Sequence, residues 1–241
     1  MEAHQHYRAP ESTLTEQTGS RSGGSVEAAL AGLSNWSIGD IAGKSWQLVS
    51  GFKAVFWLTM LAYIGAAMAL GFITGAINSA IGNAVVAVAL ELVSSALLMP
   101  LMVGLVMLGV RHAAGKDISF AMAGRYYNRI VPLFALNILV MLIVFLGLLA
   151  LVIPGIYLAI SYAFAAPLMV EKNMGIWEAM ETSRKAITRC WFRYFGLALL
   201  SGLVMFAGAL ALGIGLIWTM PMAVLMFASV YHDMFGFEDD A

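Results

Sequence analysis

The sequence carries little charge, and this scarcity excludes an ordinary soluble protein. Of its 241 residues, 11% are Asp, Glu, Lys or Arg, whereas 61% are hydrophobic, and the mean hydropathy is +0.85. A soluble globular domain has about 25% charged and about 45–50% apolar residues. The composition therefore predicts an integral membrane protein.

Cysteine and the sequence signatures of enzymes are also scarce. Cys190 is the only cysteine, so the chain cannot form an internal disulfide. The sequence has no glycine-rich phosphate loop, nucleophile elbow, dinucleotide fingerprint or His/Cys cluster with metal-ligand spacing. We therefore expect no catalytic residue, no metal and no cofactor. The basic segments are short and close to the apolar runs, which argues against nucleic-acid binding.

Long uncharged runs fill most of the remaining sequence. There are three such blocks: Ala54–Val110, with Glu91 as its one charge, Ile130–Val170 and Tyr194–Tyr231. Each is long enough for two spans of roughly 20 residues. Gly, Pro and Asn mark a break near the middle of each block. The sequence thus predicts an all-α membrane protein with six transmembrane helices in three hairpins, over residues 54–77, 84–110, 131–152, 155–171, 194–212 and 215–233.

The basic residues predict the orientation of these helices. All 13 Lys and Arg residues lie in the N-terminal region through Lys53 or in the segments 111–129 and 172–193, and none lies in a predicted hairpin turn. Basic residues are retained on the cytoplasmic side of a membrane. We therefore expect cytoplasmic N- and C-termini, with the three turns on the opposite side.

The segments that precede the three hairpins resemble one another. They begin near Ser37, Ser119 and Gly175, and each combines apolar, aromatic and basic residues. This composition predicts an amphipathic interfacial helix before each hairpin. Aromatic and basic residues together suit the headgroup region. The residues expected to contact lipid headgroups are Arg125, Arg129, Arg184, Lys185, Arg189 and Arg193.

The chain is expected to have three parts. Residues 1–36 are rich in small and polar residues and predict a disordered cytoplasmic tail. Residues 37–236 form the predicted six-span membrane domain, and residues 237–241 form an acidic C-terminal tail.

Glu91 is the one charged residue inside an apolar block. A charged side chain at the centre of a span costs on the order of 2.5–3.5 kcal/mol on insertion scales, so such a residue is a candidate functional site. Glu91 could bind a proton or a cation, or pair with a basic group of another helix. The alternative is that span 2 begins just after Glu91, which would then lie at the outer interface.

Three prolines stand in similar surroundings within the apolar runs. Pro100 and Pro167 both begin the letters PLMV, and Pro221 begins the looser copy PMAV. Neighbouring helices can compensate a proline in a transmembrane helix. Repeated kinks at these prolines would splay the bundle and open a cavity. The alternative is a chance match in a chain rich in Leu, Met and Val.

Two groups of residues form a recognisable pattern. They are Ala166, Pro167, Gly175, Ala179, Ser183, Ala186, Trp191 and Phe195, and the closing Tyr231, His232, Asp233, Phe235 and Gly236. Over roughly residues 37–236, and most clearly in its last third, the chain resembles a loose group of bacterial inner-membrane proteins. The group includes the YciC family and the membrane domain attached to some glycerophosphodiester phosphodiesterases. The resemblance implies a six-helix inner-membrane domain of largely unknown function, without the phosphodiesterase catalytic domain.

Two functions from different classes follow from the sequence. The first is a non-enzymatic scaffold, lipid-interacting or envelope-maintenance factor, whose partners are membrane lipids and a possible membrane protein. The second is a small-molecule or ion transporter that uses Glu91 and the proline-kinked helices containing Pro100, Pro167 and Pro221. A membrane-embedded lipid enzyme is a third and weaker interpretation.

Overall fold

A computed structural model describes residues 23–238 of the chain. This part is all-helical and contains no strand, as the sequence predicts. The elements are α1 Val26–Ala31, α2 Ile38–Ile81, α3 Ala84–Ala113, the 3-10 helix η1 Phe120–Arg129, α4 Ile130–Ala150, α5 Val152–Ser161, α6 Ala165–Glu171, α7 Ile176–Arg189, α8 Trp191–Leu210 and α9 Leu216–Phe235.

Five helical segments among the described residues are long and apolar enough to cross a membrane. Helix α9 has 20 residues but is not one of the five, and its last turn includes the polar residues His232 and Asp233. The structure thus supports a membrane-embedded protein with several apolar helices. The five segments are Ile38–Ile81, Ala84–Ala113, Phe120–Ala150, Val152–Glu171 and Trp191–Leu210.

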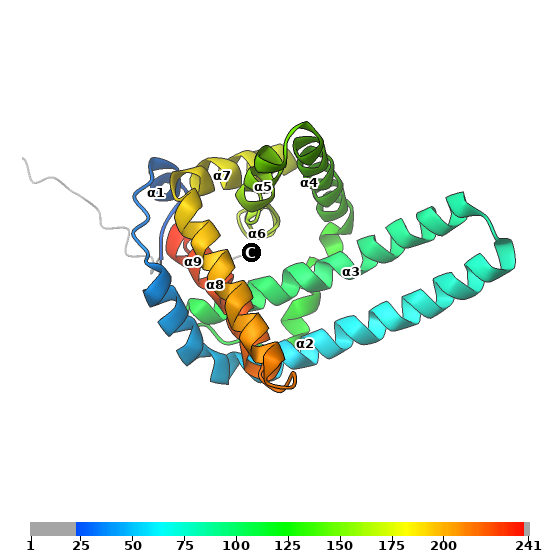
Figure 1. Ribbon diagram of the computed structural model, residues 1–241, viewed down its shortest axis with the longest axis horizontal. Helices are drawn as coiled ribbons and strands as arrows, with labels where there is room; N and C mark the ends of the chain where they lie inside the picture. The colour runs from blue at the N-terminus through cyan, green and yellow to red at the C-terminus, as the bar shows by residue number, and fades with distance from the viewer. Residues whose placement is uncertain (1–22, 239–241) are drawn as a thin grey trace, which may run out of the picture.

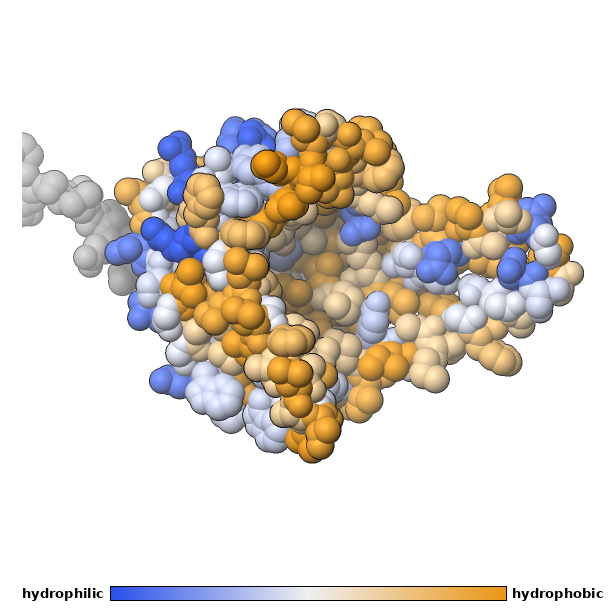
Figure 2. Space-filling view, in the orientation of Figure 1, coloured by the Kyte–Doolittle hydropathy of each residue, from blue (hydrophilic) through white to orange (hydrophobic). Residues whose placement is uncertain are grey.

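The end of α2 and the start of α3 form a long antiparallel arm that extends away from the other helices (Figure 1). Gly82 ends α2 with a φ of 64°, a left-handed conformation that suits glycine. The side chain of Asn83 then caps α3 by accepting hydrogen bonds from the backbone N–H groups of Val85 and Val86. Phe72 is 81% exposed on this arm, whose surface is largely hydrophobic in Figure 2. Such a surface suits contact with lipid.

Helix α9 is the centre of the hydrophobic core. Its side chains Leu225, Met226 and Tyr231 are fully buried. Close packing against α3 depends on Gly109, where an added Cβ would lie 3.1 Å from the Cβ of Ala228. The first part of α2 also runs along α9, because Lys44 reaches Asp233 near one end of α9 and the indole N–H of Trp57 donates to the carbonyl of Ile217 near the other. From Pro221 onward, α9 is therefore largely enclosed by its neighbours.

The three hairpin turns lie far apart. Figure 1 shows the α2–α3, α4–α5 and α8–α9 turns at three separate edges of the molecule. The hairpins therefore diverge, whereas a parallel bundle would bring the turns together. One contact also differs from the expected topology. The ammonium group of Lys53, which was expected at the cytoplasmic end of its span, lies 5.2 Å from the ring centroid of Trp218, in the first turn of α9 beside the α8–α9 turn.

Of the three interfacial helices expected before the hairpins, two are not separate α-helices. Residues 38–53 are the start of the continuous 44-residue helix α2, although Ser37 does cap it by accepting from the N–H of Asp40 at 3.1 Å. The second segment is the 3-10 helix η1, which leads directly into α4. The third segment is a separate helix, α7. Its apolar residues Met180 and Ile187 are buried against the other helices, so this face is not left for lipid.

The fourth predicted span, residues 155–171, is broken into two helices. Helix α5 ends at Ser161 and α6 begins at Ala165. Ser183 of α7 bridges the break, because its hydroxyl accepts from the N–H of Phe164 at 3.2 Å and donates to the carbonyl of Ser161 at 2.8 Å. All three residues are buried, so these bonds satisfy backbone groups that have left the helical pattern.

The prediction of disorder through residue 36 is wrong for the described part of this tail. Residues 26–31 form α1, which Ser25 caps. Trp36 is 5% exposed, and Arg193 donates to its carbonyl at 3.0 Å and lies 5.4 Å from its ring centroid. These contacts attach the segment to α8. The remainder of the predicted N-terminal tail, residues 1–22, and residues 239–241 of the predicted C-terminal tail lie outside the described residues.

Candidate functional site

A cavity of about 500 Å³ lies between helices α2 and α3 on one side and helices α4 and α6 on the other. Figure 2 shows the molecule hollowed between α4 and the arm. A volume of this size lies within the 300–1,000 Å³ typical of small-molecule sites. The lining comes from α2, α3, α4, the α5–α6 break and α6, through Tyr63, Glu91, Ser94, Ser95, Leu98, Met99, Met102, Val103, Val106, Phe134, Asn137, Ala163, Ala166 and Pro167.

Glu91 is the one charged residue that lines this cavity. Within the described residues it forms no hydrogen bond or ion pair, so its carboxylate is available to a ligand. Glu91 is exposed at this cavity, so its carboxylate can be reached from the open side. An unpaired carboxylate between apolar helices favours a proton, a cation or a hydrogen-bond donor as its partner.

A few further polar groups share the cavity with Glu91. Ser95 lies one helical turn further along α3, Asn137 comes from α4, and Tyr63 comes from α2. The Ser94 hydroxyl donates to the carbonyl of Leu90 at 2.9 Å, so its hydrogen is already used. The rest of the lining is aliphatic, aromatic or methionine. A largely apolar wall with a few placed polar groups is the usual character of a site for an amphipathic molecule.

The broken fourth helix forms one wall of the cavity. Ala163 belongs to the break, and Ala166 and Pro167 belong to the first turn of α6. Proline is tolerated there because N–H groups in the first turn have no helical partner. Discontinuous helices occur at the ligand sites of transporters, where irregular backbone lines a cavity.

The three prolines do not share one role. Pro100 is buried inside α3 and Pro221 is buried inside α9, and neither lines the cavity. Pro167 alone lies beside the space that Glu91 faces. Of the four residues predicted to form one site, Glu91 and Pro167 line the same cavity, whereas Pro100 and Pro221 do not. The different positions of the prolines also indicate that the similar letters around them do not mark equivalent structural units.

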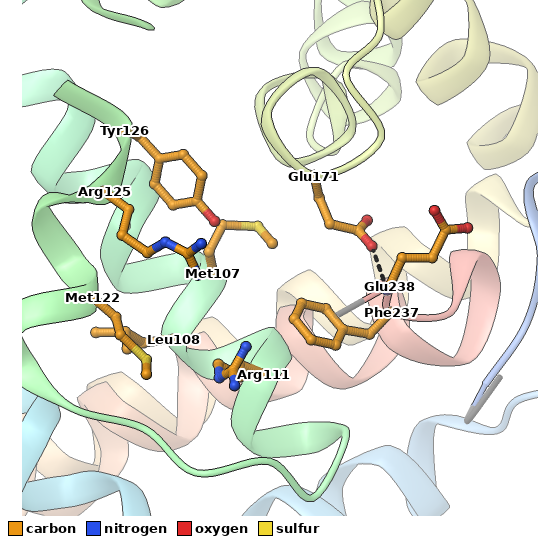
Figure 3. Close-up of a pocket in the computed structure, with 10 residues that line it drawn as sticks. Met107, Leu108, Arg111, Met122, Arg125, Tyr126, Glu171, Phe237 and Glu238 are labelled. Atoms are coloured by element: carbon orange, nitrogen blue, oxygen red, sulfur yellow. Dashed lines mark hydrogen bonds between the residues drawn. The ribbon is translucent and has the colours of Figure 1, made fainter. Parts of the chain in front are cut away.

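A second polar cluster lies where α6 meets the end of α9 (Figure 3). The buried Glu171 carboxylate accepts a hydrogen bond from the hydroxyl of Tyr231 and another, at 2.9 Å, from the backbone N–H of Glu238. The ammonium group of Lys172 lies 3.2 Å from Glu171 and 3.0 Å from Glu238. The cluster thus fixes the end of α6 to the C-terminal segment.

Arginine side chains face this cluster across a small space. Figure 3 shows Arg111 of α3 and Arg125 of η1 on the side opposite Glu171. The enclosed volume is about 20 Å³, which holds about one water molecule. The guanidinium carbon of Arg111 lies 5.7 Å from the ring centroid of Phe237. The space is too small for an organic ligand, so we interpret this cluster as structural.

The closing motif Tyr231-His232-Asp233 also makes contacts that hold helices together. Asp233 pairs with Lys44 at 3.0 Å and with the imidazole of His232 at 3.1 Å. The carbonyl of His232 accepts from the N–H of Gly24 at 3.2 Å. These bonds hold α2 and the segment before α1 against the end of α9. Among the described residues, no three His, Cys, Asp or Glu side chains gather as a metal site would require.

The six basic residues predicted to contact lipid headgroups do not form one surface. Arg125 faces the Glu171 cluster, Arg129 donates to the side chain of Asn173, and Arg193 contacts Trp36. The other three, Arg184, Lys185 and Arg189, line a separate cavity of about 360 Å³ on α7.

Several residues of these sites were not predicted from sequence. Tyr63 gives no local signal, because an isolated tyrosine in an apolar run is common. Glu171 is adjacent to Lys172 at the end of a run and looks like an ordinary interfacial residue. The closing motif around Tyr231 and Asp233 was the one available signal for these contacts.

Comparisons with protein-family models, curated proteins and solved structures find no match to this chain. The resemblance to the YciC group therefore stays a prediction.

Proposed function

We propose that this protein is a non-enzymatic, multi-pass protein of a bacterial inner membrane that binds an amphipathic small molecule or lipid beside Glu91. The observation that carries the proposal is the 500 Å³ cavity with one unpaired carboxylate in an otherwise largely apolar lining. The apolar wall suits a hydrocarbon part of the ligand, and the carboxylate suits a cationic head.

Six membrane crossings are part of this proposal. The N–H of Gly24 bonds to the carbonyl of His232, so the two ends of the described chain lie together. Ends on one side of a membrane require an even number of crossings. Five segments qualify by length and composition, and α9 is the remaining 20-residue helix. If α9 is the sixth crossing, both termini lie on the same side of the membrane. The positions of the basic residues favour the cytoplasm as that side.

Cysteine protection tests the cavity directly. We would replace Cys190 with Ala and Ser95 with Cys, and label the new thiol with a small membrane-permeant maleimide. Dodecyltrimethylammonium should slow the labelling, because its cation pairs with Glu91 while its chain fills the apolar part. Dodecyl maltoside, which has a neutral head, should not. Adding Glu91→Gln should abolish the protection. Equal protection by both amphiphiles would contradict a role for the carboxylate.

Transport of the bound molecule is a second candidate function, favoured by the α5–α6 break in the cavity wall. A discontinuous helix offers two half-helices that can move relative to one another. Uptake of a fluorescent alkylammonium into proteoliposomes tests this function. Uptake that exceeds protein-free vesicles and is lost in Glu91→Gln would support transport. Binding without uptake would leave a binding protein.

A further inference from the structure

A cluster of basic side chains lies on the outward face of α7, apart from the Glu91 cavity. We name it the α1–α7 corner and define it by the residues that line a cavity of about 360 Å³ between these helices: Leu30, Arg184, Lys185, Thr188 and Arg189. Three of the five side chains are cationic. Glu181 is the acidic group that bonds to them, at 2.7 Å to Arg184 and 3.4 Å to Lys185. Three positive charges less one negative charge leave a net charge of +2.

The basic side chains of the corner have more N–H donors than the hydrogen bonds within the corner use. Glu181 uses two N–H groups of Arg184, whose guanidinium has five. Lys185 and Arg189 are exposed, and the aliphatic stem of Arg189 lies against α1, where a Cβ added to Gly32 would be 3.7 Å from it. Guanidinium and ammonium groups are the usual ligands of phosphate oxygens. The corner therefore favours a phosphate-bearing anion.

The backbone beneath these side chains is firmly held. Ser183 ties α7 to the α5–α6 break, as described above, and the hydroxyl of Thr188 lies 2.6 Å from that of Tyr157 on α5. The ring of Tyr157 stacks on Trp191, with centroids 6.3 Å apart. An anchored helix presents its outward cations in fixed positions, which lowers the entropic cost of binding.

Exposed apolar side chains border the corner and indicate a lipid. Leu33, just after α1, is 74% exposed, and Phe192, just after α7, is 85% exposed. Trp177, on the same face of α7 as Arg184, is 66% exposed. A soluble anion needs no such neighbours, whereas aromatic and apolar groups beside cations are typical of the headgroup region.

We propose that the α1–α7 corner binds the phosphate group of an anionic membrane lipid, with Lys185 and Arg189 donating to the phosphate oxygens and Leu33 and Phe192 contacting the acyl chains. Arg184 supplies a further donor while Glu181 holds its guanidinium in place. This site is separate from the Glu91 cavity and does not depend on the ligand proposed there.

Lipid titration of the full chain tests the proposal. The protein in dodecyl maltoside is titrated with phosphatidylglycerol, and bound lipid is counted by native mass spectrometry. The double variant Lys185→Gln/Arg189→Gln should raise the Kd for the first lipid about tenfold or more. The charge-matched pair Lys116→Gln/Arg129→Gln should change it about twofold or less. Equal weakening by both pairs would overturn the site, because general surface charge would then explain the binding.

Two further measurements distinguish a lipid from a free anion as the ligand of the corner. Leu33→Ser/Phe192→Ser should weaken phosphatidylglycerol binding several-fold, and millimolar inorganic phosphate should compete poorly. Strong competition by inorganic phosphate, with no effect of the Leu33 and Phe192 changes, would overturn a lipid site and indicate a free-anion site. None of the altered residues lines the Glu91 cavity, so this test can fail independently of the ligand proposed there. All the altered side chains are exposed or partly exposed, and circular dichroism with thermal unfolding confirms folding for each variant.

Discussion

The hydroxyl of Ser183 donates a hydrogen bond of 2.8 Å to the backbone carbonyl of Ser161. This bond joins α7 to the end of α5, and the same hydroxyl accepts from the N–H of Phe164 on the other side of the break. One side chain thus supplies the partners that two buried backbone groups lost when the helix was interrupted. Because the break forms a wall of the Glu91 cavity, Ser183 supports that cavity without touching it.

Replacing Ser183 with Ala should destabilise the protein by about 1–3 kcal/mol, the cost of leaving a buried polar group without a partner. The measurement is the free energy of unfolding in detergent. Ser229→Ala is the matched control, since Ser229 is equally buried but its hydroxyl has no hydrogen-bond partner among the described residues. Equal effects of the two substitutions would show that the Ser183 bonds do not hold the break.

The Tyr231 hydroxyl and the buried Glu171 carboxylate make a second prediction. Tyr231→Phe should cost about 1.5–3 kcal/mol, as is usual for a hydrogen bond to a charged group. Tyr194→Phe should cost less, because Tyr194 is buried but its hydroxyl forms no hydrogen bond within the described chain. Thermal unfolding of both variants checks the difference. A smaller loss for Tyr231→Phe than for Tyr194→Phe would contradict an anchoring role for the Glu171 cluster.

Helix α7 should respond to acid through Glu181. The hydrogen bond from Arg184 lowers the pKa of this carboxyl to about 2. A carboxyl with a lowered folded-state pKa stabilises the fold above its unfolded pKa, and this contribution is lost as the pH falls toward the folded value. Unfolding temperatures between pH 5 and pH 2 should therefore fall less steeply for Glu181→Gln than for the unaltered protein. If the unfolding temperatures of both proteins fall equally with pH, the Glu181–Arg184 pair contributes nothing to stability, which is the case for many exposed ion pairs.

Reporter fusions test the orientation. An alkaline phosphatase fused after Ile153 should be active, and one fused after Lys116 should be inactive, since this reporter requires the non-cytoplasmic side. A fusion in the α8–α9 turn, after Ile214, is the most informative, because Lys53 contacts Trp218 near that turn. Activity there would support six crossings. Inactivity would place this turn on the cytoplasmic side of the membrane, where the basic residues are expected, and would reduce the number of crossings.

Composition and charge spacing predict the helical class and several of the helix ends. Gly82 and Asn83 end α2 and start α3 as their residue types suggest, and α7 follows from its helical periodicity. The break at Tyr162 and Ala163 could not be predicted, because its residues are apolar and its partner, Ser183, lies about twenty positions away in sequence. The divergence of the hairpins was missed for a similar reason. Local patterns fix where a helix ends, whereas the packing of distant helices fixes its direction.

The sequence identifies Glu91 as a candidate by its rarity, but not the cavity around it. Asn137 and Ser95 are also visible as polar residues in apolar runs, and hydrogen bonding between helices would have explained them equally well. Only the fold shows that they share a space with Glu91 and Pro167. The predicted companions Pro100 and Pro221 lie elsewhere, because helical proline carries no information about which helices face one another.

Native mass spectrometry of the protein purified in native lipid is the measurement that tests the central claim most directly. We would compare the unaltered protein with Glu91→Gln and with Glu178→Gln, which removes an exposed carboxylate on α7. We expect an amphipathic molecule bound to the unaltered protein and to Glu178→Gln, and absent from Glu91→Gln. The same bound molecules in all three proteins would contradict a ligand site at Glu91. A stable protein partner present in all three, with no bound small molecule, would instead indicate a scaffold.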